Sequence, residues 1–276
     1  RITGILAEIY QRVERVYPTD GDLKNIRTLI TYIKNMMLGE DEIEALNEEA
    51  ECKISVIYRE YCSKLKELQM IGYDDQMVYA YVMLKKIPWL LAHFQELYPY
   101  ICVDESQDTS KIQHAIIALL AARTENLFMV GDEDQSIYGF RAAYPEALLE
   151  FEQRHRGAKV LLMEENFRSD ANIVAAADHF IQKNTLRHEK HMRASRESVQ
   201  QIKEISVGTR KAQYAYLAKV AEGCTTETAV LYREHECALP LIDLLERIHD
   251  IEGIERIRIG SLEPRIVTEE TAARMA

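Results

Sequence analysis

Two short apolar runs that both end at acidic residues constrain the fold of this chain more than any other feature. Residues 101–103 lead into Asp104 and Glu105, and residues 127–130 lead into Gly131 and Asp132. Such runs are typical of buried parallel strands that end at the ligand-facing edge of an α/β sheet. The stretch between them has helical periodicity, which predicts a βαβ unit. Both acidic ends then lie at one edge of the sheet.

An Asp-Glu pair at the end of a strand has a specific chemical use. Asp104 can hold the water shell of Mg²⁺, while Glu105 stays free to accept a proton from an attacking water. A solvated acidic loop is the alternative for any single pair of this kind. The second strand with its Gln135, together with Arg168 further on, favours a site over that alternative.

Composition excludes several classes of protein. The 276 residues carry 34 Lys and Arg against 45 Asp and Glu, a net charge of -11, so any contact with nucleic acid must be local. Five cysteines without C-x-x-C spacing support neither a disulfide framework nor a zinc site, and a reducing cytoplasm fits. No apolar run is long enough to cross a bilayer, so no membrane partner is expected. The chain opens on Arg1 inside a helical pattern, and we expect an internal fragment.

The periodicity predicts helices through residues 5–70 and then a helix over 76–86, which Asp74 and Asp75 would cap. Further helices are predicted over 111–123, 145–155, 171–183, 211–221 and 239–248, and further strands over 159–163, 202–207 and 228–232. Residues 183–196 hold five Lys or Arg and two His, which predicts a surface loop. The alternative hypothesis is that this loop contacts the phosphate backbone of nucleic acid.

Four segments resemble motifs of the UvrD/Rep/PcrA group of superfamily 1 DNA helicases. Residues 103–108 are similar to its Walker B motif in the DExQD form, and residues 130–141 to its GDxDQSIY-x-[WF]-R motif. Residues 165–169 are similar to N-[YF]-R-S, and residues 229–233 to the AVLYR strand. The resemblance implies an α/β fold of partial RecA-like P-loop NTPase sheets with an inserted helical subdomain.

The resemblance also implies roles for single residues. Asp104 would bind Mg²⁺ through water, Glu105 would activate the hydrolytic water of ATP, Gln135 would sense the γ-phosphate, and Arg168 would contact that phosphate from the second motor domain. Phe167 stands where the family stacks adenine. Tyr138, Phe140 and Arg141 fall where the family contacts single-stranded DNA. For the two aromatic residues, Tyr138 and Phe140, a place in the hydrophobic core is the alternative.

The departures from the family pattern are as informative as the matching motifs. No G-x-x-x-x-G-K-[ST] occurs, so the phosphate-binding loop is missing, and we expect the chain alone to be inactive. The implied division is a helical 1B-like subdomain over 1–70, the later part of the first RecA-like domain (1A) over 71–156, and the first part of the second (2A) over 157–247. Residues 248–276 resemble instead a segment of the radical SAM tRNA methylthiotransferases, without that family's cluster-binding cysteines.

The leading hypothesis is thus a piece of an ATP-dependent 3′-to-5′ DNA helicase that acts on single-stranded and duplex DNA in repair or replication. A helicase-nuclease subunit is one alternative. A DNA- or partner-binding module without motor activity is another, and a Gly-Lys-Thr loop encoded upstream of Arg1 would argue against it.

Overall fold

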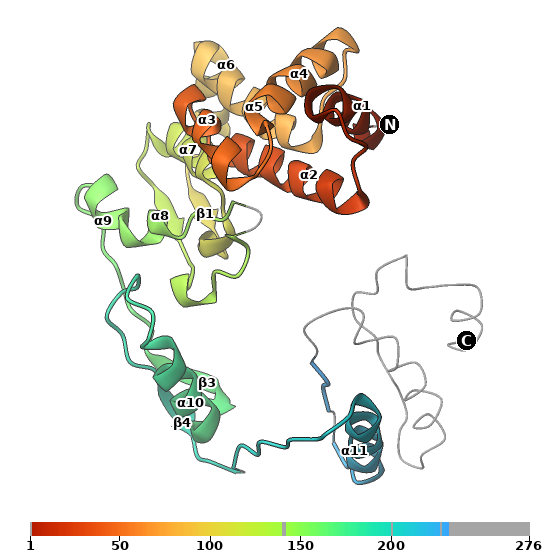
Figure 1. The fold of residues 1–276 in the computed structure, drawn as a ribbon. Coiled ribbons are helices and arrows are strands. Elements are labelled where there is room, and N and C mark those ends of the chain that lie inside the picture. The colour runs from red at the N-terminus through yellow and green to blue at the C-terminus, as the bar shows by residue number, and fades with distance from the viewer. Residues whose placement is uncertain (1, 140–141, 200, 227, 232–276) are drawn as a thin grey trace. The chain divides into compact units, whose positions relative to one another are not determined.

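A computed structural model describes residues 2–139, 142–199, 201–226 and 228–231. Residues 1–200 form one compact unit, and residues 201–276 belong to a second. The helices of the first unit, coloured from red to teal in Figure 1, are α1 (Ile2–Glu14), α2 (Asp20–Asn35), α3 (Glu40–Glu49), α4 (Ile54–Glu67), α5 (Tyr73–Lys86), α6 (Pro88–Leu97), α7 (Lys111–Ala121), α8 (Glu146–Leu149), α9 (Phe151–Arg154) and α10 (Ala171–Ile181). Its strands are β1 (Ile101–Val103), β2 (Leu127–Met129), β3 (Glu165–Asp170) and β4 (Arg193–Arg196), and α11 (Arg210–Glu222) lies in the second unit.

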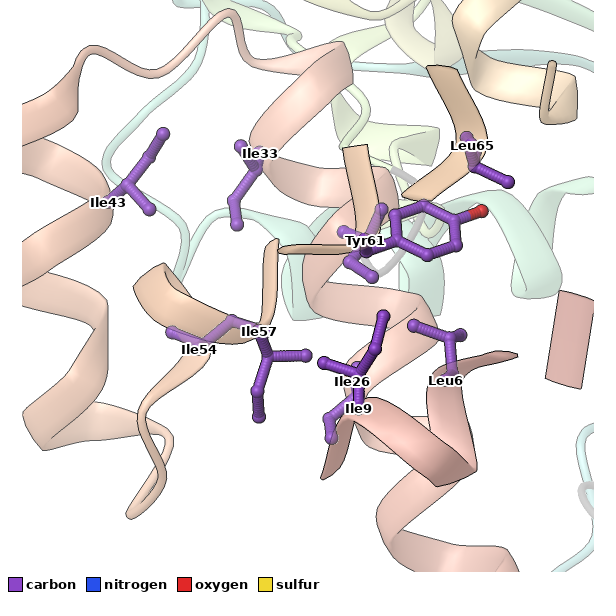
Figure 2. Close-up of a cluster of buried hydrophobic side chains, with 10 residues drawn as sticks. Leu6, Ile9, Ile26, Ile33, Ile43, Ile54, Ile57, Tyr61 and Leu65 are labelled. Atoms are coloured by element: carbon purple, nitrogen blue, oxygen red, sulfur yellow. The ribbon is translucent and has the colours of Figure 1, made fainter. Parts of the chain in front are cut away.

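The main hydrophobic core lies among α1 to α4, as the apolar periodicity predicts. Ile54 and Ile57 on α4 are completely buried, and they face apolar side chains from the other three helices (Figure 2). The buried residues of this cluster are Leu6, Ile9, Ile26, Ile30, Ile33, Ile43, Ile54, Ile57, Tyr61 and Leu65. Burying side chains of this size stabilises the fold by about 1.5 to 3 kcal/mol each. The helical subdomain can therefore hold its shape through its own core.

Buried polar contacts join α2 of this subdomain to α5. Asp75 accepts a hydrogen bond from the backbone N–H of Gly72 at 2.7 Å, so it caps α5 as predicted. It also pairs with the buried Lys34 of α2, with 2.6 Å between Nζ and Oδ1. Asp74 does not cap the helix. It accepts hydrogen bonds from Thr31 and Asn35 of α2 instead, because α2 packs against the first turn of α5.

The predicted βαβ unit is present. β1 and β2 pair in parallel, with Ile101 opposite Leu127 and Val103 opposite Met129, and α7 connects them. A capping box at Ser110 and Gln113 starts α7. Because parallel strands point the same way, the loops that follow β1 and β2 leave the sheet at the same edge.

Three predicted strands are wrong. Residues 159–163 and 202–207 have irregular backbone, as do residues 228–231, while Tyr232 lies outside the described residues. The strand after α9 is instead β3, which begins at Glu165 and pairs in parallel with β4 at the end of the basic segment. A short apolar run becomes a strand only where a partner offers hydrogen bonds. That partner is β4, and it pairs with residues 165–170 rather than with residues 159–163.

The architecture is thus mixed helix and strand, and the described part of the chain contains two small parallel sheets. Within the described ranges, the structure contains no helix with the length and apolar character needed to span a membrane.

Candidate functional site

The end of β1 places two exposed carboxylates at the open edge of the sheet. The carboxylate of Asp104 accepts a hydrogen bond from the backbone N–H of Glu105 at 2.9 Å. Glu105 itself has φ 49° and ψ 44°, in the left-handed region, and the short 3₁₀ turn Ser106–Asp108 follows it. This conformation costs a residue with a Cβ about 1 kcal/mol or more, and such strain gathers at functional sites. The strained turn leaves both carboxylates accessible to a ligand.

Gln107 connects this turn to the loop after β2. Its side chain is 2% exposed. The Nε2 atom donates to Glu105 Oε2 at 2.7 Å, and Oε1 accepts from the backbone N–H of Asp132 at 3.0 Å. Gly131 permits this approach, because a Cβ there would lie 2.8 Å from Leu148 Cδ1 and 2.9 Å from Gln107 Oε1. The acidic pair and the second loop are therefore held in one hydrogen-bonded assembly.

The second loop carries Gln135 on a 3₁₀ turn, Glu133–Gln135, that begins after Asp132. Asp132 caps the turn by accepting from the N–H of Asp134, and its Oδ2 accepts from Gln135 Nε2 at 2.7 Å. Burial acts to raise the pKa of Asp132, but the hydrogen bonds from Lys190 and Gln135 outweigh it and lower that pKa overall. Asp132 is therefore ionised near neutral pH and fixes the amide of Gln135.

The structure thus brings together three of the predicted site residues, Asp104, Glu105 and Gln135, through Gln107 and Asp132. No functional role was predicted for Gln107 or Asp132. The available signal was their position, because both stand within a few residues of a strand end at the same sheet edge.

Arg168 and Phe167 lie apart from this assembly on β3. Both are exposed, with Phe167 62% accessible. Asn166 orders the irregular part of β3, because its side-chain oxygen accepts from the backbone N–H groups of Arg168 and Ser169 at 2.9 and 2.8 Å. Arg168 makes no hydrogen bond with Glu105 or Gln135 in the described structure. Its predicted contact with a phosphate remains a prediction.

The predicted DNA-contacting residues are only partly covered by the structure. Tyr138 is half-buried and its backbone carbonyl accepts from Ala143 at 3.3 Å. Phe140 and Arg141 lie outside the described residues. The basic segment 183–196 is not a free loop, because Arg187 and Lys190 are buried in ion pairs with the loop after β2. Those two cations are therefore not available to DNA phosphates in this conformation.

The donor set at the end of β1 fits a weakly held Mg²⁺ rather than a metal bound by a dedicated protein cage. Across the described residues, no group of three or more His, Cys, Asp or Glu side chains is arranged to hold a metal. Mg²⁺ keeps several waters and is commonly bound through one or two carboxylates plus phosphate oxygens of the substrate. An exposed Asp104 at the sheet edge meets that requirement.

Comparison with known proteins supports the resemblance to the UvrD/Rep/PcrA helicases. Residues 3–156 match the family model described as the UvrD/REP helicase N-terminal domain. The chain is 31% identical over 211 residues to the ATP-dependent DNA helicase PcrA of Staphylococcus epidermidis, covering 74% of this chain and 29% of that protein. It is 37% identical to DNA helicase II of Rickettsia typhi (59% of this chain, 25% of that protein) and 33% identical to PcrA of Bacillus subtilis (69% and 25%).

The chain spans roughly a quarter of the length of these relatives. Neither the family match nor these relatives support the resemblance of residues 248–276 to radical SAM methylthiotransferases, and those residues lie outside the described structure. The family match covers more than half of the chain, including both sheet-edge loops that form the assembly around Gln107. The chain therefore belongs to the UvrD/REP helicase family.

Proposed function

We propose that this chain is part of an ATP-dependent DNA helicase that couples ATP hydrolysis to 3′-to-5′ movement on single-stranded DNA and to duplex unwinding in repair or replication. The supporting observation is the strained Glu105, which stands exposed at the sheet edge and is hydrogen-bonded through Gln107 to the loop of Gln135. This arrangement lets a general base and a phosphate-sensing amide move as one unit. Family membership supports ATP as the nucleotide and DNA as the substrate.

The domain assignment forms part of the proposal. Residues 1–70 correspond to a 1B-like helical subdomain, residues 71–156 to the later part of a first RecA-like domain, and residues 157–247 to the first part of a second. The separate hydrophobic core of α1 to α4 and the βαβ unit after α6 support the first two assignments. Because the phosphate-binding loop is absent from the chain, the chain alone does not turn over ATP in this proposal.

The chemistry follows from the positions of the side chains. Glu105 accepts a proton from water as the water oxygen attacks the γ-phosphorus, and the bond from that phosphorus to the oxygen of the leaving ADP breaks. Asp104 would hold Mg²⁺ through its water shell, and the bound ion would neutralise charge on the phosphate oxygens. Gln135 donates its amide toward the γ-phosphate, and Arg168 supplies positive charge from the second domain.

Contacts beyond the phosphates complete the proposed function. Phe167 stacks on adenine, which suits its exposed ring on β3. Tyr138 and Phe140 stack on bases of single-stranded DNA, with Arg141 beside them, which gives grip without sequence readout.

The deciding experiment replaces Glu105 by Gln in the full-length protein. We expect DNA-stimulated ATP turnover to fall roughly 100-fold or more, the range for loss of a general base, while ATP binding persists because only the proton acceptor is removed. Glu125→Gln is the matched control, because Glu125 is also an exposed glutamate in the left-handed region, with φ 54°, but lies away from the sheet edge that carries the site. Wild-type turnover in Glu105→Gln, or an equal loss in Glu125→Gln, would contradict the assignment.

A further inference from the structure

Three consecutive acidic residues in the loop after β2 are matched by three basic residues far along the chain. Arg187 forms a two-pronged pair with Asp134, with Nε to Oδ1 at 2.9 Å and Nη2 to Oδ2 at 2.8 Å. Lys190 Nζ lies 2.7 Å from Asp132 Oδ1 and 3.2 Å from Glu133 Oε2. His188 completes the set, since its backbone N–H donates to Glu133 Oε1 at 2.9 Å. We call these six residues, 132–134 with Arg187, His188 and Lys190, the charge network.

Four side chains of the charge network are almost fully buried, whereas those of Asp132 and His188 are 35% and 27% exposed. The side chains of Arg187 and Asp134 are 5% and 10% exposed, and those of Lys190 and Glu133 are 10% and 5% exposed. A buried charge that loses its partner is strongly destabilising, because neither water nor another ion replaces the partner. Burial alone would lower the pKa of Lys190, but the hydrogen bond to Asp132 and the nearby carboxylates raise it overall. Lys190 is therefore a permanent cation against this loop.

Asp132 is the point at which the charge network meets the candidate site. One carboxylate oxygen, Oδ1, accepts from Lys190, and the other, Oδ2, accepts from Gln135 at 2.7 Å. The backbone N–H of the same residue donates to Gln107, which in turn holds Glu105. With one oxygen fixed by a buried ammonium, the carboxylate plane is set, and so is the direction in which Gln135 presents its amide. The path from Lys190 to Gln135 runs through a single carboxylate.

We propose that Lys190 is a positioning residue for Gln135. It fixes Asp132, and through Asp132 it orients the amide that senses the γ-phosphate, so that the segment 187–190 and the phosphate-sensing loop respond together to the nucleotide. The inference rests on the function proposed above for Gln135, and it adds a residue outside the resembling motifs. The bidentate Arg187 and Asp134 pair serves as the anchor that keeps Lys190 in reach.

The test compares DNA-stimulated ATP turnover of Lys190→Ala, Lys190→Arg and Lys183→Ala in the full-length protein. A misplaced catalytic group costs roughly 10- to 100-fold in rate, so we expect kcat of Lys190→Ala to fall by that factor with KM for ATP nearly unchanged. Lys190→Arg should recover most of the rate, because it restores a cation to Asp132. Lys183 lies in the same basic segment but only faces the ring of Phe180, at 6.0 Å, so its substitution is the control. A loss confined to KM, or no loss at all, overturns the proposal.

A second arm asks whether Lys190 acts through Gln135. If it does, the variant that combines Lys190→Ala with Gln135→Ala is no slower than Gln135→Ala alone. Losses that multiply in the combined variant show an independent, merely structural role and overturn the proposal. Should Lys190→Ala fail to fold, Lys190→Gln keeps an aliphatic stem and a donor while removing the charge, and the same comparison applies to it.

A third arm does not depend on turnover. Amide hydrogen exchange of residues 132–136, measured without nucleotide, should accelerate in Lys190→Ala and not in Lys183→Ala, because Asp132 loses the ammonium group that holds it. Unchanged exchange there overturns the positioning role even if turnover falls. If the wild-type protein hydrolyses no ATP, the proposed function fails, and the positioning role toward a phosphate fails with it. If the wild type is active and Lys190→Ala matches it, only the present inference fails.

Discussion

Replacing Gln107 by Met tests the hydrogen-bonded assembly at the sheet edge directly. Met fills nearly the same volume in the buried site but can neither donate to Glu105 nor accept from the backbone of Asp132. The perturbation therefore removes two hydrogen bonds without opening a large cavity. Glu105 is exposed, so water replaces its lost donor, while the N–H of Asp132 lies in a part-buried position beside Gly131 and Leu148.

The magnitude follows from these two environments. Losing the bond to the exposed carboxylate costs about 1 kcal/mol, because water compensates most of it, and orphaning a partly buried N–H costs about 1 to 2 kcal/mol. We therefore expect the free energy of unfolding to fall by about 2 to 3 kcal/mol. ATP turnover should also fall, roughly tenfold or more, because Glu105 loses the contact that orients it.

Urea unfolding followed by circular dichroism measures the first quantity, and a coupled ATPase assay on the full-length protein measures the second. Gln76→Met is the matched control, because Gln76 is an exposed residue on α5 with no side-chain hydrogen bond in the described structure. If Gln107→Met and Gln76→Met were equally stable, the link between the two loops would contribute nothing to the fold. If Gln107→Met were destabilised yet fully active, the link would not orient Glu105.

Two further predictions concern stability. Ile57→Ala should lower the free energy of unfolding by about 2 to 5 kcal/mol, because Ile57 is 0% exposed in the core of α1 to α4, whereas Val56→Ala on the exposed side of the same helix should cost far less; equal losses would show that the core is not where the structure places it. Burial lowers the pKa of His114 from 6.5 to about 4, so the unfolded chain binds the extra proton first as the pH falls. The contribution of the neutral His114 to the free energy of unfolding is complete above pH 6.5. It is lost as the pH is lowered toward 4, and the loss is about 2 kcal/mol after allowance for partial exposure. His114→Leu should flatten the dependence of the free energy of unfolding on pH, measured by urea titration between those pH values. An unchanged dependence would assign the effect to another titrating group.

The sequence by itself determined the features that depend on short windows of chain. The apolar periodicity predicted the helical character of residues 5–70 and a helix over 111–123, where α7 is observed, because a helix closes its hydrogen bonds within a few residues of itself. The two apolar runs that stop at Asp104 and Asp132 predicted β1, β2 and their shared edge, because the connecting helix leaves few ways to pair them. Gly72 and the acidic residues that follow it predicted a helix start at residue 76, whereas α5 already begins at Tyr73 and contains both Asp residues.

Only the tertiary structure decided the pairings between distant segments. Residues 160–163 are all apolar, like β2, yet β4 pairs with residues 165–170, since a strand is defined by the partner that completes its hydrogen bonds. The basic segment suggested a phosphate contact in isolation, but its Lys190 is neutralised by Asp132, 58 residues earlier in the chain. Gln107 gained its role in the same way, from a backbone N–H 25 residues away. Periodicity and turn preference are local properties, whereas the partner of a buried polar group is fixed by which segments the fold brings together.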